Sequence, residues 1–244
     1  MKKAILIGVL VLVGVSVAYC QHFWFPYTWH QKMTIEVEVD GQVLTGASVM
    51  KVSWRKNDPI GAANGPEWLG GIRGEAPYVE IPGRGVLFGL ISVAGHSSYA
   101  ADVATQMMTG QKGWARGPQE FSLVQAAKGQ TLPIPLDRYP LLVTFTDLTD
   151  PTTVKVVDPE NLAPTFGPGV SLKRITLEIT DEPVTEGKIE SVLGWFFEVD
   201  SLTPRDKQPR FLKDQTPEQR VSLLDFMDWK TFGEKRKKVH RKDQ

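Results

Sequence analysis

The sequence predicts a mainly β protein: an antiparallel β-sandwich or barrel-like domain with a few short peripheral helices, preceded by an N-terminal transmembrane or signal helix. The 22 glycines and 17 prolines among 244 residues favour turns and short strands over long helices. Several segments alternate apolar and polar residues with the period of a half-buried strand. We expect four parts: a membrane anchor or signal segment with an aromatic belt (1–32), a β-rich domain (33–200), a linker and C-terminal amphipathic helix (201–233) and a basic disordered tail (234–244).

The N-terminal segment predicts targeting to a membrane. Lys2 and Lys3 precede an uncharged run from Ala4 to Tyr19. Lysines stay on the cytoplasmic side while an apolar stretch enters the bilayer, so the rest of the chain is expected outside the cytoplasm. The alternative is that the run forms a buried core segment.

Three fates of this segment stay open. Cleavage near Ala18 fits the small residues at 16–18. Lipidation of Cys20, the single cysteine, is disfavoured by the large Tyr19 before it. Retention as an anchor fits the range 4–20, which is just long enough to cross about 30 Å of hydrocarbon.

Aromatic and histidine rings follow the apolar run and favour retention. Such amphipathic rings collect at the membrane–water interface, where a cleaved segment would have no use for them. The alternative is that the rings belong to the core of the body. They are the side chains of Tyr19, His22, Phe23, Trp24, Phe25, Tyr27, Trp29 and His30.

The clearest secondary-structure signal is a β-hairpin at the start of the body. Residues 33–39 alternate apolar and polar, and Asp40-Gly41 separates them from a second strand over 42–54. The glycine- and proline-rich stretch 55–75 is expected to be a loop.

A second hairpin is predicted from strands 77–81 and 86–93 around the turn 82–85, with a second arm that is apolar on both faces, as in a central strand. The remaining strands are expected at 141–146, 153–157 and 172–180, the last with Ile175, Leu177 and Ile179 on one face, and short helices at 99–108 and 121–128.

The C-terminal amphipathic helix is expected to begin at Thr216, which has the spacing of a capping box with Gln219. Val221, Leu224 and Met227 then share one face at helical spacing, and the helix should end near Gly233.

The charge distribution argues against nucleic acid as a partner. Residues 4–233 carry 20 basic and 26 acidic side chains, and binding of phosphates needs clustered cations. The basic tail 235–242 is the exception. It is expected to be a solubilising tail, or to contact anionic lipid or an acidic protein.

Four stretches resemble an uncharacterised family of proteobacterial proteins with an N-terminal membrane segment and a β-rich exported domain. The resemblance covers most of the chain except the C-terminal helix and tail, and it implies no activity. It implies a bacterial protein of the cell inner membrane, single-pass, with the body facing the periplasm; the alternative is secretion to the periplasm after cleavage near Ala18. The stretches are YTWHQKMTIEVEVDGQVLTGASV (27–49), PYVEIPGRGVLFGLI (77–91), PLLVTFTDLTDPTTV (140–154) and FGPGVSLKRITLEITDEPVT (166–185).

The residue patterns predict no catalytic, cofactor or metal residues. His96 beside Ser97 and Ser98 offers a base and a nucleophile, but adjacent residues rarely converge, and a G-x-S-x-G elbow is missing. Arg84, in the turn of the second hairpin, is exposed and available to a ligand, although such an arginine is usually just solvated.

Two sets of residues have side chains that can bind metal ions, but neither set predicts a metal site. His22 and His30 are eight apart, which matches no familiar metal site. The oxygens of an acidic cluster are suited to calcium, but aspartates at turns usually bond nearby backbone N–H groups. The cluster consists of Asp147, Asp150, Asp158 and Glu160.

We therefore expect a membrane-anchored, periplasmic β-domain that acts as a non-enzymatic interaction or accessory module for an unknown partner. The alternative is an envelope serine hydrolase that uses His96 with Ser97 or Ser98.

Overall fold

The computed structural model describes residues 27–92, 99–111, 113, 117–197, 221–228 and 233. Within these ranges the chain is mainly β, with two antiparallel sheets and short helices, which confirms the predicted class. No helix in the described part of the chain is long and apolar enough to span a bilayer. The expected N-terminal helix and the basic tail lie outside these ranges.

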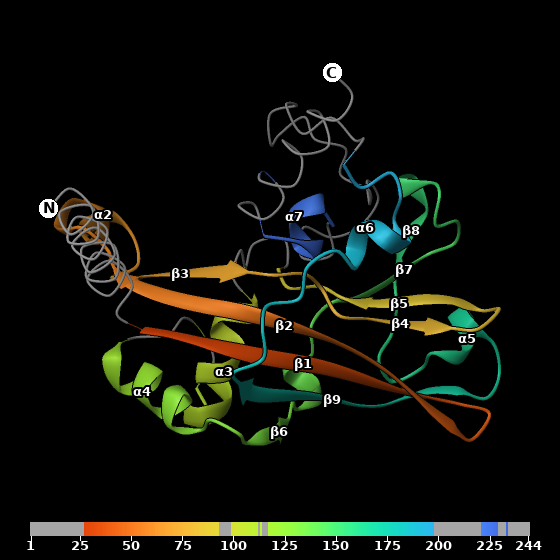
Figure 1. Ribbon diagram of the computed structural model, residues 1–244, viewed down its shortest axis with the longest axis horizontal. Coiled ribbons are helices and arrows are strands. Elements are labelled where there is room, and N and C mark those ends of the chain that lie inside the picture. The colour runs from red at the N-terminus through yellow and green to blue at the C-terminus, as the bar shows by residue number, and fades with distance from the viewer. Residues whose placement is uncertain are drawn as a thin grey trace, which may run out of the picture.

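A long hairpin is the centre of the larger sheet (Figure 1). Strands β1 (Tyr27–Val39) and β2 (Gln42–Lys56) pair in register from Tyr27 opposite Trp54 to Val39 opposite Gln42. Asp40 and Gly41 both have positive φ, of 49° and 84°, as the tight turn of a β-hairpin requires. This confirms the predicted hairpin. The sheet order is β3-β2-β1-β9-β6, with β3 (Trp68–Arg73), β9 (Val170–Thr180) and β6 (Thr131–Pro133).

The second sheet has the order β4-β5-β7-β8 and contains the second predicted hairpin. Its central strand β5 is buried along most of its length, as expected from its apolar sequence. The strands are β4 (Tyr78–Ile81), β5 (Gly85–Gly89), β7 (Leu142–Phe145) and β8 (Val154–Val156).

The second sheet packs against the distal half of the long hairpin, and two glycines make the close approach possible. A Cβ on Gly46 of β2 would fall on the carbonyl oxygen of Tyr78 in β4. A Cβ on Gly89 would lie 2.9 Å from Cδ1 of Ile35. The two layers therefore depend on glycine at these two positions.

Helices cover the other half of the same face of the long hairpin. The amide of Gln31, fully buried, donates to the carbonyl oxygen of Ala100 in α3 at 2.5 Å. The predicted helices at 99–108 and 121–128 correspond to α3 (Tyr99–Thr109) and α4 (Pro118–Ala126). The other helices are α2 (Pro59–Asn64), α5 (Ala163–Phe166), α6 (Ile189–Val192) and α7 (Leu223–Phe226), with 3-10 turns at Leu136–Arg138 and Pro151–Thr153.

Two stretches differ from the sequence-based expectation. The stretch 55–75, expected to be a loop, contains α2 and the edge strand β3. Its glycines serve packing: a Cβ on Gly70 would lie 2.9 Å from the ring of Trp54 on the neighbouring strand. The first strand begins at Tyr27 rather than Met33. The buried Gln31 breaks the apolar alternation, which hid the true start of the strand.

The C-terminal helix is also shorter at its described residues than expected. A capping box between Ser222 and Asp225 starts the single turn α7, and Met227 is already extended (φ −151°, ψ 139°). Met227 instead forms a β-bridge with Glu75. The expected helical face of Val221, Leu224 and Met227 is therefore absent from these residues.

Candidate functional site

The beginning of β1 is held by a cluster of five aromatic rings, which we call the N-terminal aromatic cluster. Phe121 of α4 is at its centre: its ring lies 5.0 Å from those of Tyr27 and Trp54, 5.3 Å from Trp68 and 6.4 Å from Trp29, measured between centroids. Tyr27 and Trp29 thus pack in the body, as in the alternative to an interfacial belt. The rings of residues 19–25 lie outside the described ranges.

A pocket opens beside this cluster because β9 ends before β1 does. The β1–β9 ladder begins at His30 opposite Thr180, so Tyr27, Thr28 and Trp29 extend past it. At this open edge the amide of Gln125 donates to the carbonyl oxygen of Thr28 at 3.0 Å. The end of α4 therefore takes the place of the missing strand at one point only.

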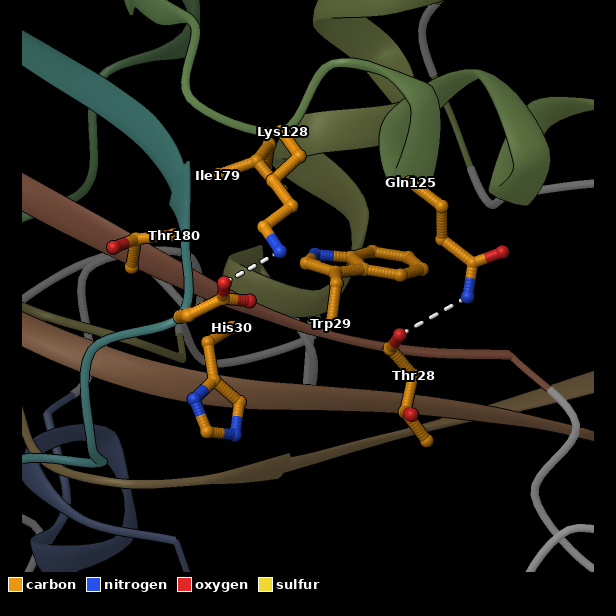
Figure 2. A pocket seen from close by; sticks show the side chains of 8 residues that line it. Thr28, Trp29, His30, Gln125, Lys128, Ile179 and Thr180 are labelled. Carbon is orange, nitrogen blue, oxygen red and sulfur yellow. Dashed lines mark hydrogen bonds and ion pairs between the residues drawn. The ribbon is translucent and has the colours of Figure 1, made fainter.

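The pocket has a volume of about 350 Å³. Figure 2 shows the side chains that line it. Three segments contribute to it: the start of β1, the end of α4 with the turn that follows it, and the end of β9. Its lining combines hydroxyl, amide, imidazole and charged groups with the carbon surface of a tryptophan. The lining residues are Thr28, Trp29, His30, Gln125, Lys128, Ile179, Thr180 and Asp181.

One ring nitrogen of the histidine in this pocket is hydrogen-bonded within the protein. His30 Nδ1 lies 2.7 Å from the carbonyl oxygen of Glu182. A carbonyl oxygen only accepts, so Nδ1 carries the hydrogen and Nε2 of the neutral ring can accept from a ligand. The indole N–H of Trp29 is used internally, since it donates to Gln31 at 2.9 Å. Trp29 therefore offers the pocket its carbon surface.

Two ion pairs lie along the wall that follows β9. Lys128 Nζ lies 2.5 Å from Asp181, and Lys32 Nζ lies 2.7 Å from Glu182. The hydrogen bond that Lys32 donates to Glu182 raises the pKa of Lys32, which keeps this ammonium charged. Together with His30, these lysines hold the chain at 181–182 in place.

The sequence-based candidate residues have different outcomes. His30 lies in the pocket, whereas His22 and the group His96, Ser97 and Ser98 are outside the described ranges, so the histidine-pair and hydrolase hypotheses stay predictions. Among the described residues, no three histidine, cysteine, aspartate or glutamate side chains come together as metal ligands.

The aspartates of the acidic cluster accept hydrogen bonds from backbone N–H groups of their own turns. Asp147 accepts from the backbone N–H of Thr149 at 2.8 Å, and this bond lowers the pKa of the Asp147 carboxyl. Asp150 accepts from Thr152 in the same way, also at 2.8 Å. At 2.9 Å, the carboxylate of the third aspartate, Asp158, accepts from the backbone of the fourth member, Glu160.

Arg84 joins two turns of the fold. Its guanidinium donates to the carboxylate of Asp40 and to the carbonyl oxygen of Pro168, each at 2.7 Å. It therefore ties the tip of the long hairpin to the loop before β9, which is a structural role rather than that of a solvated side chain.

A second polar site, the carboxylate of Glu75, was not predictable from the sequence. This side chain is fully buried and accepts from the backbone N–H groups of Gly187 at 2.7 Å, Lys188 at 2.9 Å and Ile189 at 3.1 Å. It fixes the start of α6, while the backbone of the same residue bridges Met227. Its role is structural.

The pocket residues Gln125, Lys128 and Asp181 were also not predicted. Each is an ordinary surface residue in its own segment, and only the tertiary fold brings the three segments together. Comparison of the chain with protein-family models, with curated proteins and with solved structures finds no match.

Proposed function

We propose that this protein is a membrane-anchored, periplasmic binding module that works without catalysis and takes its ligand or partner in the pocket at the start of β1. The pocket carries the proposal because its lining combines the carbon surface of a tryptophan with polar groups from three segments.

The chemistry of the pocket supports binding. The imidazole of His30 is oriented by a carbonyl oxygen and not by a carboxylate, so it lacks the acid that orients a catalytic base. The charges of Lys128 and Asp181 compensate each other. A polar ligand without large net charge suits this lining.

The position of the pocket supports anchoring close to a membrane. Residues 21–26 are all that separate the end of the apolar run from β1. Six residues span at most about 20 Å, so the pocket would lie within that distance of the bilayer surface. An N-terminal transmembrane helix is part of this proposal, in the inner membrane, and secretion after cleavage near Ala18 is its alternative.

The finer fold class belongs to the same proposal. We regard the two packed sheets as a partial β-sandwich in which helices replace the second sheet over half of the first. The basic tail 235–242 would add contact with anionic lipid or an acidic protein.

The test is photo-crosslinking in cells followed by purification of the full chain from membranes. Thr180→Trp should fill the pocket without touching the core, because Thr180 lies on the outer face of β9, half-buried. Thr45→Trp is the matched control, since Thr45 is exposed at the distal end of the same sheet.

The proposal predicts a component that is crosslinked to the parent chain and to the Thr45→Trp variant and is lost with Thr180→Trp. If the parent chain enriches no envelope component, or if both variants retain it equally, binding through this pocket is wrong.

A further inference from the structure

The short helix α2 presents an apolar face to solvent. Its sequence is PIGAAN, without a charged residue. Ile60 is 81% exposed, the highest value among the exposed large hydrophobic side chains of the described residues. Pro59 and Ala63 are exposed as well, and Ala63 is a neighbour of both Ile60 and Pro59 on the helix surface, because it follows them by three and four residues.

The loop around α2 is built to hold this face in one position. The carboxylate of Asp58 caps the helix by accepting from Gly61 N–H at 2.8 Å. Asn57 closes the loop, because its backbone N–H donates to the carbonyl oxygen of Glu67 at 2.7 Å and its side-chain amide donates to the carbonyl oxygen of Pro66 at 3.0 Å. Exposure of Ile60 is therefore a property of an ordered loop.

This face lies at the end of the body where the N-terminal segment joins it. Tyr27, the first described residue, pairs with Trp54, and α2 begins at Pro59, shortly after the end of β2. Figure 1 shows α2 at that same end of the molecule. The 26 preceding residues include the range 4–20 that is expected to cross the bilayer.

We propose that the exposed face of α2 docks on the surface of the phospholipid bilayer that holds the N-terminal segment. This inference rests on the anchoring in the proposed function. We choose a lipid interface as the partner because the apolar run would hold α2 beside the bilayer at high effective concentration. A small apolar contact is then enough for α2 to bind the lipid surface.

Two of the charges beside α2 are engaged within the loop. The carboxylate of Asp58 caps the helix. Lys56, the nearest described cation before α2, lies 3.5 Å from Glu67, so the pair is compensated. Docking through α2 should therefore be insensitive to salt, unlike attraction of the basic tail 235–242 to anionic lipid. A second attachment point would also fix the orientation of the pocket relative to the membrane.

The test uses the full chain with Cys20→Ser, reconstituted in phosphatidylcholine vesicles. An environment-sensitive fluorophore is attached at Ala63→Cys or, as control, at Thr45→Cys on the distal end of the sheet. Lipids brominated near the headgroup act as quenchers, and a carbonate wash reports whether the chain stays in the bilayer.

We expect a blue shift and quenching at position 63, unchanged in high salt, reduced by Ile60→Asp and missing at position 45. Three results would overturn docking. The first is a probe at position 63 that stays in water although the chain resists the carbonate wash. The second is a blue shift without lipid quenching, which indicates coverage by the N-terminal segment, and the third is a shift that grows with the protein-to-lipid ratio, which indicates a second copy. Release by carbonate instead contradicts the anchoring itself.

Discussion

The N-terminal aromatic cluster and the site around Glu75 hold the fold in opposite ways. In the cluster, four rings pack around the fifth, Phe121, and supply carbon surface beside a pocket lined with polar groups. At Glu75, a buried charge is satisfied by three backbone N–H groups. The first region borders the pocket that we propose takes a ligand, whereas the polar groups of the second join segments of the body.

This difference tells which polar residues are candidates for function. A polar group that is already saturated inside the protein has a structural task, and its removal should affect stability. A polar group at an open edge should affect binding while stability changes little. The following substitutions test that division, from the largest expected effect to the smallest.

Phe121→Ala should lower the free energy of unfolding by about 4 kcal/mol, because it removes a fully buried ring from the centre of the cluster. Urea unfolding followed by tryptophan fluorescence measures the change. Leu123→Ala on the same helix is the control: Leu123 is 51% exposed, so its loss should cost less than about 0.5 kcal/mol. Equal effects would show that the cluster does not hold β1.

Glu75→Ala should lower the free energy of unfolding by about 3 kcal/mol, because it leaves buried N–H groups without their acceptor. Glu75→Gln should cost less, since its amide oxygen can still accept. The exposed Glu80 on β4 provides the control Glu80→Ala. Chemical denaturation of all three variants decides the matter, and a stable Glu75→Ala variant would refute the structural role.

Gly46→Ala should lower the free energy of unfolding by about 2 kcal/mol, because its methyl group would meet the backbone of Tyr78 and force the two sheets apart. A Cβ at Gly194 would meet open space, so Gly194→Ala is the matched control. Thermal unfolding compares the two. Similar melting temperatures would mean that the sheets are not in such close contact.

Lys128→Met should change the free energy of unfolding by less than about 0.5 kcal/mol, because the side chains of Lys128 and Asp181 are 61% and 75% exposed. The same variant should reduce the yield of the crosslinked component, since it changes the pocket wall. A large loss of stability would place this pair with Glu75 instead, as a structural element.

The strands that were predictable from sequence are those with a buried and an open face. The alternation in 33–39, with Asp40-Gly41 after it, specified the long hairpin, and Ile175, Leu177 and Ile179 are buried as expected. Local turn chemistry and period-two burial are both written within a few residues, so no tertiary information was needed.

The features that were missed depend on contacts between distant segments. Gly70 looked like part of a loop because the ring of Trp54, which makes the glycine necessary, is on another strand. The first strand was expected to start only at Met33, because Gln31 is polar and its partner Ala100 is far away in sequence. His30 was noted for a pairing with His22, while its described partner is the carbonyl oxygen of Glu182.

Anchoring of the protein depends on the fate of the first residues of the chain. The direct measurement is the intact mass of the protein and of its N-terminal peptide, purified from the membrane fraction of producing cells. We predict a chain that keeps residues 1–26 and stays in the membrane fraction. A lipidated start at Cys20 would replace the transmembrane anchor by a lipid anchor, and a soluble chain that starts at Tyr19 would contradict anchoring altogether.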